Sequence, residues 1–346
     1  MNCDIMSKAK SGCFMIKKHI KAAIPAPMKT AIKGRLYKAV AWMLNQLENL
    51  LGELITFHTR PMRAADVLTL GAAPGKSYKN FAIVMQGPII TKRDFTVETL
   101  KLYRKFFPDA LRVLSTWEGE DERHLTVAKQ TGAEIILNRK PPVFGPANIN
   151  LQLTSAKAGV QFAATLGVEY VLKTRTDQRM YQSAALDVLS NLLKTFPPKG
   201  GMAQRGRIIG LGAYNFATKK KMFHLYDHLI FGFTPDVQKY FGADLVPQKP
   251  ELEFLKQFYP NDPFTAEGYF YTEFLKKVGY NLDYTEGSYL RSLAEHCILI
   301  EPVLLDWYWY GKHRRFLEYQ LSTPNYKSPR HHGFADWLNL YQANIK

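Results

Sequence analysis

The chain is poor in cysteine, with three residues among 346, and none of these (Cys3, Cys13 and Cys297) belongs to a CxxC or CxH pair. We therefore expect neither a disulfide framework nor a cysteine-bound structural zinc, and a reducing compartment is the default environment. Long apolar runs are missing too, because no stretch approaches the roughly 18 apolar residues of a membrane-spanning helix. The N-terminal segment lacks the apolar core of a secretory signal. These absences predict a soluble, cytoplasmic protein.

Acidic residues are scarce at the N-terminus. Residues 1–40 hold nine Lys or Arg residues and one acidic residue, Asp4, so half of the net charge of +16 lies there. Such a segment is attracted to an anionic membrane surface by about 1 kcal/mol per basic residue. We predict the inner face of the inner membrane as its partner, and a solvated basic tail is the alternative. Zinc-finger spacing, an RNP motif and an Arg-rich recognition helix are missing, so no nucleic acid partner is expected.

Residues 39–58 carry an apolar stripe at helical spacing, made of Val40, Met43, Leu44, Leu47, Leu50, Leu51 and Leu54. This pattern predicts an amphipathic helix, whose stripe would pack on the following domain, lie on a membrane or pair with another copy. Prolines and glycines between residues 59 and 80 indicate a linker. We therefore divide the chain into a basic, helical extension with its linker at 1–80 and a main domain at 81–346.

From residue 81 onward, short apolar strands alternate with helices. Strands are predicted at 81–85, 111–115, 134–137 and 170–174, and helices at 96–107, 121–131 and 148–166. This order, with its short connections, predicts an α/β fold with a mostly parallel sheet and helices on both faces. In such sheets, ligands bind at the carboxyl ends of the strands.

Polar side chains follow the predicted strands. The last strand ends in Lys173-Thr-Arg-Thr-Asp-Gln-Arg179, in which three cations flank one carboxylate, Asp177. A carboxylate placed there can hold Mg²⁺ or Mn²⁺ while Lys and Arg face phosphate oxygens, which predicts a nucleotide site. The alternative is that Arg175 and Arg179 only neutralise Asp177 in a surface network.

Four of these segments resemble the WavE family of lipopolysaccharide synthesis proteins. They are VMQGP at 84–88, LSTWE at 114–118, NINLQ at 148–152 and YVLKTRTDQR at 170–179. The resemblance implies a GT-A-like nucleotide-sugar-binding fold. It also implies a glycosyltransferase that moves a sugar from a nucleotide-sugar donor to a lipopolysaccharide core or related cell-surface glycan, a lipid-linked saccharide.

The resemblance also implies roles for the matching side chains. Asp177 would stand where GT-A enzymes place the DXD carboxylate that holds a divalent cation, Mg²⁺ or Mn²⁺. The sequence offers one carboxylate there rather than two, so either Asp177 with the diphosphate holds the ion, or Arg175 and Arg179 replace it. The expected substrate-binding residues, of which the first four would border the nucleoside, are Gln86, Gly87, Thr116, Trp117, Asn148, Asn150, Gln152, Lys173, Arg175, Gln178 and Arg179.

Sugar transfer also requires a group that takes a proton from the acceptor hydroxyl, which suits a carboxylate or a histidine. The candidates are Asp227, Glu267 and, less favoured, Glu273. Glu267 precedes a helix-like run, so the alternative is a carboxylate placed to favour a helix N-terminus. The aromatic residues 307–310 would stack on an acceptor sugar or pack in a core. A nucleotidyltransferase of sugar activation and a non-catalytic nucleotide- or glycan-binding component remain alternative functions.

Overall fold

The computed structural model describes residues 26–52, 59–68, 76–214, 222–247, 265–310 and 331–345. The chain separates into two compact units, residues 1–60 and 61–346. In the first unit, α2 (Ala26–Leu51) is a helix of 26 residues. It begins earlier than the helix predicted at 39–58, of which residues 53–58 lie outside the described part, as do residues 1–25 of the basic segment. No described helix is long and apolar enough to cross a membrane.

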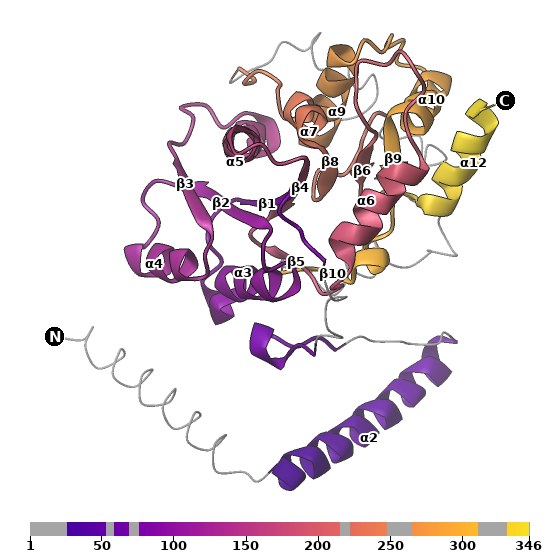
Figure 1. The fold of residues 1–346 in the computed structure, drawn as a ribbon. Helices are drawn as coiled ribbons and strands as arrows, with labels where there is room; N and C mark the ends of the chain where they lie inside the picture. Colours follow the sequence, from indigo (N-terminus) through magenta and orange to yellow (C-terminus); the bar gives the residue numbers. More distant parts are fainter. Residues whose placement is uncertain are drawn as a thin grey trace. The chain divides into compact units, whose positions relative to one another are not determined.

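The second unit is built on a seven-stranded sheet with the order β3-β2-β1-β4-β8-β6-β9 (Figure 1). Its strands are β1 (Phe81–Gln86), β2 (Leu111–Trp117), β3 (Glu134–Asn138), β4 (Tyr170–Arg175), β6 (Ile208–Gly210), β8 (Ile230–Phe233) and β9 (Cys297–Leu299). Strands β1 to β4 pair in parallel, β8 runs antiparallel to β4 and β6, and β6 and β9 are parallel. The predicted α/β class with a mostly parallel sheet is confirmed.

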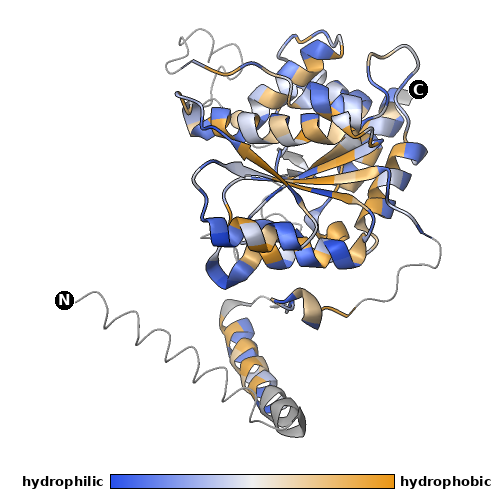
Figure 2. Cartoon of the chain, turned by 60° about the vertical axis from the view of Figure 1, so that its left-hand side comes forward, coloured by the Kyte–Doolittle hydropathy of each residue, from blue (hydrophilic) through white to orange (hydrophobic). Residues whose placement is uncertain are grey.

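Helices cover both faces of the sheet (Figures 1 and 2). On one face lie α5 (Ile149–Thr165) and α7 (Thr234–Tyr240), and on the other lie α3 (Phe95–Phe106) and α4 (Glu122–Gln130). Helix α5 packs close to the sheet at Gly159, where a Cβ atom would lie 2.5 Å from Val84 Cγ1 and 3.0 Å from Ser115 Cβ. The core between these layers includes the buried apolar residues of β1 and β4.

The remaining elements complete the second unit around this sheet. They are α6 (Ala185–Thr195), α9 (Ala266–Lys277), α10 (Glu286–His296), α12 (Phe334–Ile345), the pair β5 (Gln178–Met180) and β10 (Trp307–Trp309), and the pair β7 (Ala213–Tyr214) and β11 (His331–His332). The described residues also contain four 3₁₀ helices, η1 (Ala64–Asp66), η2 (Lys92–Asp94), η3 (Pro146–Asn148) and η5 (Pro302–Leu305).

Residues 61–68, which we expected in the linker, are tied to the second unit. The Ala64 amide donates to Glu98 Oε2 at 2.8 Å, and Arg179 Nη1 donates to the Met62 carbonyl at 2.9 Å. These bonds place the start of this compact unit about twenty residues before β1.

Candidate functional site

The carboxyl ends of the central strands meet in register at one edge of the sheet. Gln86, the last residue of β1, pairs with Ser115 of β2 on one side and with Arg175 of β4 on the other. Gly87 follows with a φ of +118°, and a Cβ atom there would lie 3.0 Å from Thr176 Oγ1. Only glycine allows both this backbone conformation and this close approach of the two strand ends.

A buried hydrogen-bond network lies under this edge. Ser155 Oγ of α5 donates to Gln86 Oε1 at 2.6 Å, Ser115 Oγ donates to the Ser155 carbonyl at 2.7 Å, and Asn138 Nδ2 donates to Ser115 Oγ at 2.9 Å. Beside it, Thr116 Oγ1 donates to Glu120 Oε1 at 2.8 Å, and the Trp117 ring is only 7% exposed. These bonds fix Gln86 and Thr116, two of the four residues predicted to border the nucleoside.

Arg175 and Asp177 form a two-point ion pair directly after β4. Arg175 Nε and Nη2 donate to Asp177 Oδ1 and Oδ2 at 2.9 and 3.0 Å, and Trp309 Nε1 donates to Oδ2 at 2.8 Å. Burial alone would raise the pKa of Asp177, but Arg175 and Trp309 hold it below its ordinary value. Arg175 and Trp309 thus hold the Asp177 carboxylate in place, and its role as a metal ligand stays a prediction.

Lys173 and Asp227 form a second pair, which is completely buried. Lys173 Nζ lies 3.1 Å from Asp227 Oδ2 and donates to the Asp227 carbonyl at 2.6 Å. The two side chains are 0% and 1% exposed. Burial would raise the pKa of Asp227, but Lys173, His228 and Arg175 hold it below its ordinary value. Asp227 is therefore a poor proton acceptor, and its charge is used to hold the Lys173 ammonium.

Gln178 determines which nitrogen of His228 carries the proton. Gln178 Oε1 accepts from Thr174 Oγ1 at 3.1 Å and from the Arg175 amide at 3.3 Å, so its NH₂ group faces His228 Nδ1, 2.8 Å away. Burial, and next the charge of Arg175, lower the pKa of His228 to about 4. The imidazole is therefore neutral at pH 7 and carries its proton on Nε2.

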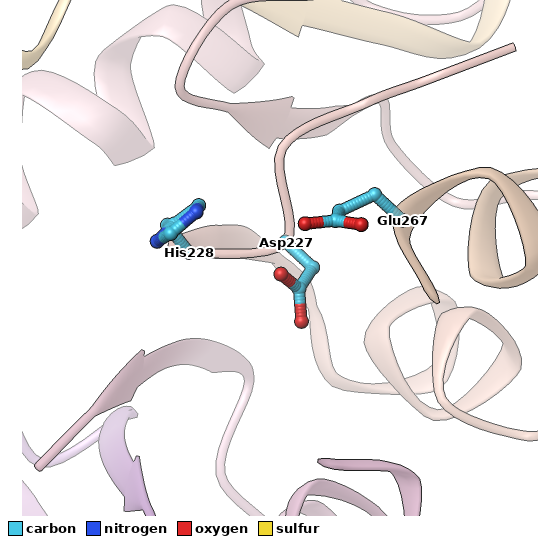
Figure 3. A group of neighbouring side chains, drawn as sticks. All are labelled: Asp227, His228 and Glu267. Atoms are coloured by element: carbon cyan, nitrogen blue, oxygen red, sulfur yellow. The ribbon is translucent and has the colours of Figure 1, made fainter. Parts of the chain in front are cut away.

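Glu267 completes the group from the first turn of α9 (Figure 3). The helix begins after Thr265, whose Oγ1 accepts from the Gly268 amide at 3.2 Å, a cap that fixes where Glu267 stands. Ligand atoms of Asp227, His228 and Glu267 all lie within 4.8 Å of one another. Glu267 is half-buried and acts electrostatically on both Lys173 and Arg175. Two of the three predicted base candidates, Asp227 and Glu267, are thus brought together, whereas Glu273 pairs with Lys276.

Two carboxylates and an imidazole are ligand types that bind divalent transition metals. In the described arrangement, however, Asp227 Oδ2 is paired with Lys173, and His228 accepts at Nδ1 and is protonated at Nε2. A metal ligand needs an unprotonated imidazole nitrogen, and the neighbour of a ligating histidine accepts the proton of its other nitrogen. Gln178 does the opposite here, so the residues as arranged do not fit a divalent cation.

Arg179 takes no part in this group. It is 1% exposed, and its guanidinium donates to Thr99 Oγ1, the Phe95 and Met62 carbonyls and Tyr181 Oη at 2.8–3.0 Å. It also lies over the Phe95 ring at 4.3 Å. These contacts give Arg179 a structural role, which corrects both predictions for it, as a phosphate-facing cation and as a neutralising partner of Asp177.

The amides at the start of α5 hold a loop. Asn150 Nδ2 donates to the Val143 and Val246 carbonyls at 2.9 and 2.7 Å, and Oδ1 accepts from the Val246 amide at 2.8 Å. Gln152 Nε2 donates to the Ala147 carbonyl at 3.3 Å, and Asn148 adopts a φ of +59° before the helix. Asn150 is thus a buried structural bridge, unlike the substrate contact expected of it.

Sequence reasoning missed His228 and the role of Trp309. The Trp309 ring lies 4.6 Å from that of His228 and 5.6 Å from the Arg175 guanidinium. Strand β10 brings it there because Trp309 pairs with Gln178 of β5, whereas Trp307 is buried in the core. The adjacency of His228 to Asp227 in the sequence was the available signal.

Comparison with known proteins gives one family match: the description "WavE lipopolysaccharide synthesis" covers residues 81–296. No curated protein matches the chain.

The similar solved structures are distant. HddC from Yersinia pseudotuberculosis is 10% identical with a TM-score of 0.29, over 51% of this chain and 86% of that one. The same protein complexed with GMP-PN gives 10% identity and a TM-score of 0.28, over 57% of this chain and 98% of that one. Mannose-1-phosphate geranyltransferase from Thermus thermophilus gives 18% identity and a TM-score of 0.26, over 38% of this chain and 41% of that one. We draw no functional conclusion from likenesses this weak.

Proposed function

The chain belongs to the WavE lipopolysaccharide synthesis family, and on that premise we propose that it is a glycosyltransferase. It would move a sugar from a nucleotide-sugar donor to a lipopolysaccharide core or related lipid-linked saccharide, at the cytoplasmic face of the inner membrane. The observation that carries the proposal is the convergence of Arg175, Asp177, His228 and Glu267 at the carboxyl end of the central parallel strands.

The leaving diphosphate needs hydrogen-bond donors and positive charge. Asp177 uses Nε and Nη2 of Arg175, which orients the guanidinium and leaves Nη1 without a hydrogen-bond partner among the described residues. In the proposal, Nη1 of Arg175 and Nε2–H of His228 donate to the diphosphate oxygens. Lys173, held in the interior by Asp227, adds positive charge without contacting the substrate. Gln86, Gly87, Thr116 and Trp117 remain the proposed border of the nucleoside.

We assign the proton-accepting role to Glu267 rather than to Asp227. Asp227 is 1% exposed and paired with Lys173, whereas Glu267 is half-buried at the start of a helix. A base must reach the acceptor hydroxyl from a position open to substrate. The aromatic face of Trp309, beside His228, is the proposed surface for a sugar ring.

The first experiment measures thermal stabilisation by UDP-, GDP-, ADP- and CMP-linked sugars, each with Mn²⁺ and with EDTA. A donor at about 100 times its dissociation constant adds roughly 2.7 kcal/mol to the free energy of unfolding. We expect one nucleotide to stabilise the protein in both conditions. Stabilisation that requires Mn²⁺ would overturn the cation-free arrangement and restore the predicted Mg²⁺ or Mn²⁺ cofactor.

The variant Arg175→Gln should lose this stabilisation. Its matched control is Arg123→Gln. Arg123 pairs in the same two-point manner with an aspartate two residues away, Asp121, through Nε at 3.1 Å and Nη2 at 2.6 Å, but on the surface. Glu267→Gln should keep donor binding and lower the rate of sugar transfer about 100-fold or more.

The released product distinguishes the remaining functions. A glycosyltransferase given donor and core oligosaccharide releases nucleoside mono- or diphosphate, whereas a nucleotidyltransferase given nucleoside triphosphate and sugar phosphate releases pyrophosphate. Donor binding without either product would favour a non-catalytic binding component.

A further inference from the structure

Helix α2 exposes apolar side chains that no described residue of its own unit covers. Leu36, Met43, Leu47 and Leu50 are 62%, 56%, 42% and 80% exposed. Together with half-buried Val40, they recur every three or four residues, which aligns them along one side of a helix. A stripe of this kind needs a partner surface, because each exposed leucine forgoes about 1.5–3 kcal/mol of burial free energy.

The opposite side of α2 is mostly polar. Arg35, Lys38, Asn45 and Asn49 fall there by their spacing from the stripe, together with one exposed aromatic residue, Trp42. Glu48 is the one acidic residue within α2, and its first turn contains none. The helix therefore continues the strongly basic composition of residues 1–40 into an amphipathic segment.

The charge of α2 decides between the partners that an apolar stripe could take. Its sequence contains four basic residues and one acidic residue, Glu48, and the basic residues Arg35 and Lys38 are exposed. Two α2 helices packed side by side would bring like charges close together. At an anionic lipid surface, these long basic side chains instead reach the phosphates while the leucines enter the acyl boundary.

We infer that α2 lies in the interface of an anionic membrane, with the stripe Leu36, Val40, Met43, Leu47 and Leu50 inserted among the lipids. This goes beyond electrostatic attraction of residues 1–40, because the apolar stripe supplies binding that salt does not screen. It does not depend on the proposed sugar transfer.

The test is sedimentation of the full chain with vesicles of phosphatidylcholine, with or without phosphatidylglycerol. Leu47→Glu is compared with Asn45→Glu, since both add one negative charge but lie about 200° apart around the helix. We expect binding to the phosphatidylglycerol vesicles, a small loss for Asn45→Glu, and an affinity lower by a further tenfold or more for Leu47→Glu.

Equal affinities of the two variants would overturn the inference. Light scattering could instead show that the wild-type protein is a dimer and that Leu47→Glu is a monomer. With vesicle binding unchanged, this result would show that the stripe binds a second copy of the chain. The third outcome is that Leu47→Glu binds vesicles like wild type but, in the absence of vesicles, melts at a lower temperature than Asn45→Glu. This result would show that the stripe packs on the second unit, and it would also overturn the inference.

Discussion

Gln178 Nε2 donates to His228 Nδ1 at 2.8 Å, and this bond fixes the neutral tautomer of the one histidine in the site. The amide cannot turn over without cost, because Gln178 Oε1 already accepts from the Arg175 amide, a group that only donates. A glutamine at 178 thus makes His228 a hydrogen-bond donor at Nε2, whereas a carboxylate at the same place would leave Nε2 unprotonated, as a metal ligand requires.

The variant Gln178→Glu should therefore move the proton of His228 from Nε2 to Nδ1 and raise its affinity for Mn²⁺ or Zn²⁺ by about tenfold or more. The ¹⁵N shifts of the imidazole report the tautomer, and calorimetry reports metal affinity. Gln182→Glu is the control, because Gln182 Oε1 accepts from the Ala184 amide in the same segment. A wild-type spectrum that already shows the proton on Nδ1 would contradict the prediction.

Stability should fall as the pH falls from about 6.5 to about 4, partly because of His228. Its pKa is about 4 in the folded protein, against 6.5 as the ordinary value, so the unfolded chain binds more protons in this window. Between pH 7 and pH 4.5, the free energy of unfolding of His228→Gln should therefore fall by roughly 2 kcal/mol less than that of wild type, as measured by urea unfolding.

His296 provides the matched comparison, since burial, with a smaller effect of Arg207, also lowers its pKa to about 4. His296→Gln should flatten the pH dependence to a similar degree while leaving donor binding intact. The same pH dependence in His228→Gln as in wild type would show that His228 titrates normally.

The sequence predicted β1 to β4 well, because each is an apolar run that ends at Gly, Pro or a polar cluster. It did not predict β6, β8 and β9, which are only three or four residues long. It also placed Asp227 and Glu267 among the candidates, because the acceptor side was expected after β4 and Glu267 precedes a helix-like run. It could not predict partners. Asp177 meets Trp309 across 132 residues, and Arg179 meets Phe95 across 84, so neither contact leaves a local pattern.

Arg179→Gln tests the corrected role of that residue. The change leaves the carbonyls of Met62 and Phe95 and the hydroxyls of Thr99 and Tyr181 without their donor. Unsatisfied buried groups cost about 1–3 kcal/mol each before relaxation, so we expect a loss of about 3 kcal/mol in the free energy of unfolding. Donor stabilisation should persist in the folded fraction. If the variant instead lost donor binding with an unchanged free energy of unfolding, Arg179 would be a substrate-binding residue.

The buried pair Lys173–Asp227 should be costly to break from one side. Lys173→Met leaves the Asp227 carboxylate buried without its cation, which costs about 3 kcal/mol or more at pH 7. Lys239→Met is the control, because Lys239 lies 3.6 Å from Asp236 Oδ1 but is 35% exposed, so its loss should cost less than about 1 kcal/mol.

The pH dependence identifies the cause of that loss. Without Lys173, burial should raise the pKa of Asp227 above its unfolded value, so the folded state would bind the extra proton. The difference in stability between Lys173→Met and wild type should then shrink as the pH falls from 7 toward 4. The double variant Lys173→Met/Asp227→Leu should recover most of the loss at pH 7, because no charge is left buried. The stability loss of the double variant could instead equal the sum of the losses of the two single variants. The two residues would then contribute separately, and the contribution of Lys173 would be its packing against the Phe241 ring, whose centroid lies 5.1 Å from Nζ.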